Sequence, residues 1–231
     1  QGVENHYMGL HSGLLDQFSS IFGASDALIL SDFRSVEVLK TVALPPGFRF
    51  VVANSMVKHN LVDSEYNTRR RDCEAAAAKL ANMFPGVKTL RDVSLAQLEE
   101  ARPVLTRLEY LRSKHVVGEC DRVWRGIAAL EAGDVEAFGR LLFESHASSI
   151  ENFENSTPEL DYLVELAHSI PGALGARLSG GGFGGITIHL VRDRDAEVYA
   201  ARLGEAFAVK FGIKAETIQC AIGGGAAVQT L

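Results

Sequence analysis

A glycine-rich run between two β-type segments is the feature that most constrains the fold of this chain. Residues 179–185 read Ser-Gly-Gly-Gly-Phe-Gly-Gly, with five glycines in seven positions. The residues on either side, 173–178 and 186–191, are mostly apolar and predict two strands. Glycine lacks a Cβ atom, so such a run can adopt positive φ angles and direct amide N–H groups at an anion. The run is therefore either a tight connection between paired strands, which is the usual role of glycine, or an anion-binding loop.

The order of the expected elements along the chain predicts an α+β fold. A short helix containing Asp16 and two strands come first, and Pro45-Pro46-Gly47 is the clearest linker, so we expect one domain at 1–46 and a second at 47–231. Apolar periodicity, the N-cap candidate Ser64 and the polar stretch 152–157 delimit the elements of the second domain. The expected helices there are 64–84, 94–111, 114–130, 134–149, 158–170 and 196–211. The expected strands are 27–32 and 36–44 in the first domain and 48–54, 173–178, 185–192 and 215–222 in the second.

Four of these helices, between residues 94 and 170, interrupt a simpler pattern. Without them the second domain has the order strand, helix, strand, strand, helix, strand, which is the split-βαβ or ferredoxin-like order. We therefore expect a ferredoxin-like domain with inserted helices, preceded by a smaller region of one helix and two strands.

Composition and charge narrow the classes of partner. A chain of 231 residues with 47% hydrophobic residues can bury a sizeable core. Its net charge of -6 gives it no general electrostatic attraction for nucleic acid or anionic membranes, so we expect neither as a partner. No apolar run is long enough to span a bilayer. Cys73, Cys120 and Cys220 are far apart and lack metal-ligand spacing, which favours reduced thiols and a cytoplasmic protein.

The glycine run also carries a family resemblance. Residues 175–185, Gly-Ala-Arg-Leu-Ser-Gly-Gly-Gly-Phe-Gly-Gly, closely resemble the third motif of the GHMP small-molecule kinases. Family members often have Cys after the last glycine, where this chain has Ile186, a change that touches no phosphate chemistry. The resemblance implies the C-terminal domain of the GHMP kinase fold, whose order agrees with the ferredoxin-like order above. It also implies a loop beside the nucleotide phosphates of ATP, formed by Gly180, Gly181, Gly182, Gly184 and Gly185.

A second segment, residues 4–18, resembles the galactokinase segment in which the catalytic Asp opens a helix behind a glycine. In the first turn of a helix, the helix dipole favours the ionised form of Asp16. Glu4 lies about 18 Å away on a continuous helix, so both acids reach one substrate only if the chain bends at Gly9 or Gly13. The resemblance implies that Asp16 is the general base and binds the sugar, that Gly13 gives the sugar room, and that Glu4 helps to hold Mg²⁺. Without the resemblance, each acid is more simply a solvated surface residue.

A third segment, residues 54–74, is similar to the galactokinase strand, loop and helix that present a Tyr to the hexose. Tyr66 is the matching residue, although a Tyr near a helix start is more often a half-buried anchor. The three arginines Arg69–Arg71 form either a phosphate-binding patch or ion pairs at helical spacing, and we favour the pairs. Their expected partners are Asp63, Glu65, Asp72 and Glu74. We expect His59 to orient the loop by a hydrogen bond rather than to act as a base.

The resemblance covers essentially the whole chain but only part of the family's architecture. Galactokinases begin with a sugar-binding segment bearing an Arg, Glu, His and Asp, and later present a Gly-Leu-Ser-Ser-Ser loop that wraps the ATP phosphates; neither is present in this sequence, which opens on Gln1 within an expected helix. We therefore expect the C-terminal part of a larger kinase, with the missing N-terminal portion as its partner. The part by itself is expected not to phosphorylate sugar, because phosphoryl transfer depends on positioning and on stabilising the phosphate charge.

The function implied by the resemblance is phosphorylation of D-galactose at its anomeric hydroxyl to galactose 1-phosphate, with ATP as co-substrate and Mg²⁺ as cofactor. Two alternatives stay open. The first is a kinase of the same superfamily for another sugar, such as N-acetylgalactosamine or arabinose, which the missing sugar-binding segment would distinguish. The second is a catalytically silent sensor that binds galactose and ATP to regulate a partner protein, which only turnover by the full-length protein would distinguish.

Overall fold

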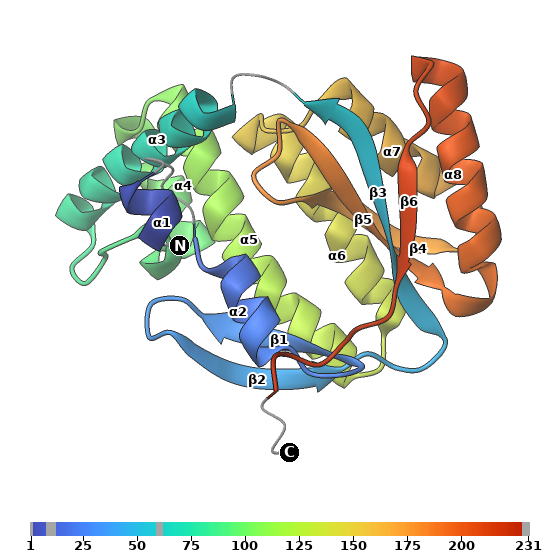
Figure 1. Ribbon diagram of the computed structural model, residues 1–231. Coiled ribbons are helices and arrows are strands. Elements are labelled where there is room, and N and C mark those ends of the chain that lie inside the picture. Colours follow the sequence, from blue (N-terminus) through green and yellow to red (C-terminus); the bar gives the residue numbers. More distant parts are fainter. Residues whose placement is uncertain (1, 8–12, 59–61, 228–231) are drawn as a thin grey trace.

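The computed structural model describes residues 2–7, 13–58 and 62–227, and their strands form two antiparallel sheets (Figure 1). The smaller sheet pairs β1 (Ala27–Asp32) with β2 (Glu37–Ala43). The larger sheet contains β3 (Phe48–Lys58), β4 (Ala173–Ser179), β5 (Gly184–Arg192) and β6 (Glu216–Cys220). Every expected strand is therefore present, with ends that differ by a few residues.

The larger sheet has the strand order β4-β5-β3-β6, and each neighbouring pair is antiparallel. This is the ferredoxin-like arrangement, in which β3 and β5 are the central strands. Alternate residues of the central strands face opposite sides: Val51 belongs to one buried cluster, whereas Phe50 and Leu190 belong to another. Both faces of the sheet are therefore covered, and the predicted fold class is confirmed.

One face is covered by α7 (Pro158–Ser169) and α8 (Ala196–Phe211), which bury Leu163 and Phe207 against it. Figure 1 shows these two helices on the side of the sheet away from α5 (Arg107–Glu131).

The sequence had assigned the first helix of the ferredoxin-like pattern to residues 64–84, and this was wrong. That helix, α3 (Val62–Met83), packs against α5 instead, because its buried side chains, such as Leu80, belong to a separate helical cluster.

The other face of the larger sheet is covered by α6 (Val135–Ser148), which lies unusually close to β4. A Cβ atom added to Gly175 of β4 would lie 2.0 Å from the carbonyl oxygen of Gly139 in α6. Only glycine permits this backbone-to-backbone contact. The contact fixes the strand that leads into the glycine loop against the helical part of the chain.

Two helix boundaries differ from the predicted ones. Residues 94–111 and 114–130 were expected to be separate helices, but α5 is continuous across that gap, and the break comes earlier, after α4 (Leu95–Ala101). Pro103 sits in the short 3₁₀ turn η2 (Arg102–Val104), because proline is disfavoured inside an α-helix. Thr106 and Glu109 then form a capping box that starts α5. Ser64 lies inside α3 rather than at its N-cap, since α3 begins two residues earlier.

The smaller sheet packs beside α2 (Leu15–Phe22). Phe18 is the buried residue of this helix. The ring of Phe18 lies 4.5 Å from that of Phe22 and 5.5 Å from that of Phe33, between ring centroids. The preceding helix, α1, covers Gly2–His6. None of the helices in the described ranges has the length and apolar character needed to cross a membrane.

The segment after β6 returns to the N-terminal region. The backbone N–H of Asp26 donates to Ile222, that of Gly225 to Gly23, and that of Ala226 to Ser20. The strand expected to reach Ile222 therefore ends at Cys220, and the residues that follow pack along α2 and β1. The predicted domain boundary between residues 46 and 47 stays a proposal. With that boundary, the last described residues of the second domain are hydrogen-bonded to the first domain.

Candidate functional site

The glycine run forms a tight turn between the paired strands β4 and β5. Four of its five glycines have positive φ angles, and so does Phe183, at 59°. A non-glycine residue in this left-handed region is strained by about 1 kcal/mol or more, so the surroundings must hold the loop in place. One such support is the buried Ser55 of β3, whose hydroxyl donates to the carbonyl oxygen of Gly185 at 3.0 Å.

Asn155 lies directly against this loop. The backbone N–H of Phe183 donates to the carbonyl oxygen of Asn155 at 2.7 Å, and the side-chain amide of Asn155 donates to the carbonyl oxygen of Gly181 at 3.1 Å. A Cβ atom added to Gly182 would lie 2.1 Å from the same carbonyl oxygen of Asn155, which explains why this position requires glycine. In the sequence Asn155 lies in the polar stretch 152–157 between two helices, where no role was predicted for it.

Tyr66, the residue predicted to contact the sugar, lies on the other side of the loop. The Cβ position of Gly181 is 3.6 Å from Cδ2 of the Tyr66 ring, and the tyrosine is half-buried. The structure therefore brings together Tyr66 and the loop predicted for the nucleotide phosphates, although 114 residues separate Tyr66 from Gly181 in the sequence.

Two of the three arginines that follow Tyr66, Arg69 and Arg70, form ion pairs, as favoured from the sequence. Arg69 pairs with Glu65 at 3.0 Å and Arg70 with Glu74 at 2.8 Å, each at helical spacing. Arg71 donates to the hydroxyl of Thr68 at 2.9 Å. Arg69 also does more than the spacing predicted, because its buried guanidinium donates to the carbonyl oxygens of Phe153 and Glu154, next to Asn155.

Asp16 lies in the first turn of α2, as predicted, but apart from Tyr66 and the loop. Its side chain is exposed and has no hydrogen-bond or ion-pair partner among the residues that the structure describes. Gly13 is also exposed, and a Cβ atom there would have no neighbour within 4 Å. Within the described part of the chain, neither residue contacts Tyr66 or the glycine loop.

The remaining predicted residues are only partly open to description. Glu4 belongs to α1, but its side chain is not among the described ones, and Gly9 and His59 lie outside the described residues. Across 2–7, 13–58 and 62–227, no three side chains of the His, Cys, Asp or Glu type form a group that could hold a metal ion. The role of Glu4 as a Mg²⁺ ligand therefore stays a prediction from the sequence.

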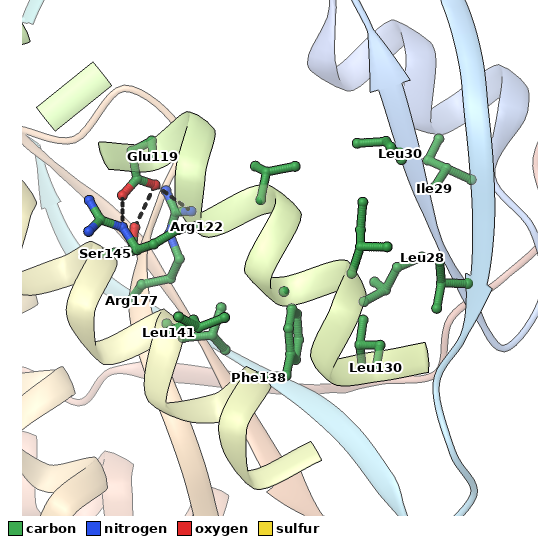
Figure 2. A pocket seen from close by; sticks show the side chains of 15 residues that line it. Leu28, Ile29, Leu30, Glu119, Arg122, Leu130, Phe138, Leu141, Ser145 and Arg177 are labelled. Atoms are coloured by element: carbon green, nitrogen blue, oxygen red, sulfur yellow. Dashed lines mark hydrogen bonds and ion pairs between the residues drawn. The ribbon is translucent and has the colours of Figure 1, made fainter. Parts of the chain in front are cut away.

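A cavity of about 270 Å³ lies between the smaller sheet, α5 and α6. Its walls are mainly apolar, and Figure 2 shows a cluster of charged side chains at one end. No residue predicted for sugar or ATP is among the described residues that line it. The apolar side chains include Leu28, Val42, Val123, Ile127, Phe138 and Leu141.

The charged end of the cavity centres on Glu119 of α5. Its carboxylate accepts from Arg122 at 2.6 Å and from the Ser145 hydroxyl at 2.8 Å, and it lies 3.5 Å from Arg177 of β4. Burial alone would raise the pKa of Glu119, but Arg177 and Arg122 outweigh it, so the pKa is lowered and the carboxylate stays ionised. Arg177 stands two residues before the glycine run, so this cluster ties the end of β4 to α5 and α6.

Sequence reasoning missed this charged cluster, although signals were present. Arg177 is a charged residue in an otherwise apolar strand, and Glu119 and Arg122 stand three residues apart on one helix, where side chains meet. One helical turn earlier, His115 stacks on Phe153 with ring centroids 4.5 Å apart. Burial lowers the pKa of His115 to about 4, so the ring is neutral at pH 7 and packs as part of the core.

Comparisons with known proteins agree with the resemblance drawn from the motifs. Residues 127–209 match the family model "GHMP kinases C terminal". The chain is 42% identical over 207 residues to a galactokinase of Roseiflexus sp., covering 90% of this chain and 53% of that protein. It is 43% identical over 191 residues to the galactokinase of Homo sapiens, covering 83% of this chain and 47% of that protein.

Among solved structures, the chain is similar to Lactococcus lactis galactokinase complexed with galactose, with a TM-score of 0.91 and 30% identity over 97% of this chain and 58% of that one. It thus spans about half the length of the curated relatives that it matches. Residues 127–209 therefore match the C-terminal domain of the GHMP kinases, and the chain is similar, over almost its whole length, to the C-terminal part of the galactokinases.

Proposed function

We propose that this chain supplies the C-terminal part of a galactokinase, which transfers the γ-phosphoryl group of ATP to the anomeric hydroxyl of D-galactose. The observation that carries the proposal is the likeness to a galactokinase that was solved with galactose, at a TM-score of 0.91 over 97% of this chain. The three cysteines are unpaired thiols, which supports a cytoplasmic location for the reaction.

The glycine loop is the part of the chain that we assign to the nucleotide phosphates. Its positive φ angles turn successive backbone groups away from the regular strand pattern, and backbone in this conformation suits an anion. Ser55 and Asn155 hold the loop from two sides, so little reorganisation is needed when phosphate binds. Such preorganised donors are a major part of phosphoryl-transfer catalysis.

Asp16 is the residue that we assign as general base. Its carboxylate accepts the proton of the anomeric hydroxyl while that oxygen forms a bond to the γ-phosphorus, and the bond from that phosphorus to the β-phosphate bridging oxygen breaks to release ADP. Asp16 lies in the first turn of α2 with its side chain exposed, so a sugar hydroxyl can reach it. Gly13 leaves space for the hexose, and Tyr66 packs against it or hydrogen-bonds to it. Mg²⁺ neutralises phosphate charge when bound, and Glu4 is the ligand that we assign to it.

The rest of the kinase is the partner that we assign to the N-terminal region. Large apolar side chains of α2 and of the turn between β1 and β2 are exposed, among them Leu15 at 55%, Val36 at 55% and Ile21 at 54%. A sheet of two strands is marginal by itself, and an apolar surface of this kind marks an interface. We place the N-terminal portion of the galactokinase on this surface, where it would bring the missing sugar-binding segment and phosphate-wrapping loop.

The test is to join this chain to the N-terminal portion of a galactokinase and to assay galactose, N-acetylgalactosamine and arabinose with ATP. Formation of galactose 1-phosphate as the dominant product supports the proposal. Preferential phosphorylation of another sugar would assign the chain to a different kinase of the superfamily. Tight binding of galactose and ATP without turnover would contradict the enzyme and favour a sensor.

A further inference from the structure

Besides Ser55, the glycine loop is supported by Asn155, which is 5% exposed. Three contacts join it to the loop: the bond from Phe183 N–H, the bond to Gly181 C=O, and the close approach of Gly182. These contacts involve three consecutive loop residues, so a shift of Asn155 would move the loop with it.

Asn155 is in turn held by an unusual stretch of backbone. It follows the π-helical turn η3 (Ser149–Phe153) and Glu154, which has a φ angle of 52° in the left-handed region. π-helical turns and left-handed non-glycine residues are strained, and they persist where the surroundings fix them. The strain here stands next to the residue that contacts the loop.

Two buried arginines from different helices supply that fixation. Arg69 of α3 donates to the carbonyl oxygens of Phe153 and Glu154, at 2.7 and 3.0 Å. Arg112 of α5 is 2% exposed, donates to the carbonyl oxygen of Asn152 at 2.5 Å and pairs with the carboxylate of Glu154 at 2.5 Å. Hydrogen bonds from a charged donor are the stronger kind, so the η3 turn is clamped between two helices.

The clamp also connects the loop to Tyr66. Arg69 stands one helical turn after Tyr66 on α3, and its guanidinium lies 5.6 Å from the centre of the Phe183 ring. The same arginine therefore contacts the backbone beside Asn155 and the side chain at the tip of the loop.

We propose that Asn155 is a positioning residue that holds the glycine loop 180–185 in a single conformation and, if the proposed function is right, sets that loop for the nucleotide phosphates. The side-chain NH₂ group of Asn155 is decisive because it donates to the carbonyl oxygen of Gly181. The side-chain oxygen of Asn155 is buried and has no hydrogen-bond partner in the described structure. In Asn155→Asp an acceptor would face the acceptor oxygen of Gly181, which is repulsive, whereas Asn155→Ala leaves that oxygen without its donor.

Asn152→Ala is a matched control for these variants. Asn152 lies three residues earlier on the same turn, is 6% exposed, and donates through its side-chain amide to the Ser148 hydroxyl at 3.1 Å. The variant therefore removes a hydrogen bond of the same length and burial in the same strained segment, but one that does not touch the loop. A general loosening of the turn affects Asn152→Ala and Asn155→Ala alike, and a positioning role affects only the Asn155 variants.

The experiment is residue-resolved amide hydrogen exchange of residues 180–185 in this chain, with and without inorganic tripolyphosphate as the probe. We expect Asn155→Ala and Asn155→Asp to speed exchange of the loop at least about fivefold, the effect of losing one hydrogen bond, and Asn152→Ala to leave it unchanged. In the wild-type chain tripolyphosphate should slow exchange of the loop, and the Asn155 variants should need a higher concentration for the same protection.

Unchanged loop exchange in Asn155→Asp, or equal acceleration in Asn152→Ala, would overturn the proposal. If Asn155→Ala does not fold, the isosteric Asn155→Asp gives the answer. If the Asn155 variants loosen the loop but tripolyphosphate protects it in no protein, the positioning role stands and the assignment of the loop to phosphate is the part that fails.

Discussion

The two halves of the candidate site differ in how firmly this chain holds them. The glycine loop is held by contacts from several elements, with Ser55 on β3, Asn155 after η3 and Arg69 on α3 all taking part, and the Tyr66 ring lies beside Gly181. Asp16 instead lies on an exposed helix turn and has no partner in the described part of the chain.

This difference indicates that the part of the site assigned to phosphate is more complete within the chain than the part assigned to the general base. The half assigned to phosphate relies on the chain's own buried contacts, so it keeps its geometry by itself. The half assigned to the base lies near exposed apolar side chains, among them Leu15 and Val36. The relatives are about twice as long, so we expect their additional residues to cover this surface.

The strongest test of the base half is Asp16→Asn in the joined kinase. Because a positioned base contributes about 10²- to 10⁴-fold, kcat should fall by that factor, while sugar binding stays within a few-fold. The unfolding free energy of the chain should change by less than about 0.5 kcal/mol, since the side chain is exposed. Steady-state kinetics measure the first effect, with the exposed carboxylate of Asp26 in Asp26→Asn as control. Retention of more than about a tenth of kcat would remove Asp16 as the base.

The loop half is tested by Gly182→Ala against Gly180→Ala. Both glycines have a φ angle of 82°, but a Cβ atom at Gly182 would meet Asn155 at 2.1 Å and one at Gly180 would meet nothing within 4 Å. We expect Gly182→Ala to lower the free energy of unfolding by about 2–4 kcal/mol and Gly180→Ala by about 1 kcal/mol. Urea unfolding measures both, and equal losses would show that the contact with Asn155 does not restrain the loop in solution.

The clamp behind the loop is tested by a second matched pair on α3. Arg69→Ala leaves two part-buried carbonyl oxygens without a charged donor, so we expect a loss of about 2–3 kcal/mol in the free energy of unfolding. Arg70→Ala, at the next position of the same helix, removes a solvent-exposed ion pair with Glu74 that is worth less than about 1 kcal/mol. Similar losses for the two variants would mean that Arg69 only pairs with Glu65.

The smallest expected effect belongs to Tyr66→Ala in the joined kinase. If Tyr66 contacts the sugar, KM for galactose should rise about fivefold, which corresponds to about 1 kcal/mol, and KM for ATP should stay nearly unchanged. Tyr66→Phe separates the hydroxyl from the ring. A loss of about 3–5 kcal/mol in the free energy of unfolding, with parallel changes in both KM values, would identify Tyr66 as a core anchor instead.

Much of the fold followed from the sequence for a simple physical reason. The strands of the larger sheet are short apolar runs bounded by proline or glycine, so their order could be predicted before their pairing was seen. The helices were harder to place, because periodicity shows that a helix has a buried face but not what that face meets. Residues 64–84 and 158–170 are both helical, yet only the second covers the sheet.

The site was predicted unevenly for a related reason. The loop, Tyr66 and Asp16 were assigned through motifs, each of which lies within one short stretch of sequence. Asn155 contacts Gly181 across 26 residues, and Arg69 contacts Phe153 across 84, so no local pattern could indicate these bonds. The polar stretch 152–157 has the composition of an ordinary connection, and only the folded chain gives it a role.

The central claim is that this chain holds one half of a galactokinase site and depends on the N-terminal portion for the other. The most direct measurement is ATP-dependent formation of galactose 1-phosphate by the purified chain alone, by the N-terminal portion of a galactokinase alone, and by the two joined in one polypeptide. We predict no product above a contaminant control from either part alone and turnover by the joined protein, because the orientation lost with the missing part can reach effective molarities of about 10⁵ M. Phosphorylation of galactose by the chain alone, abolished by Asp16→Asn, would contradict the claim.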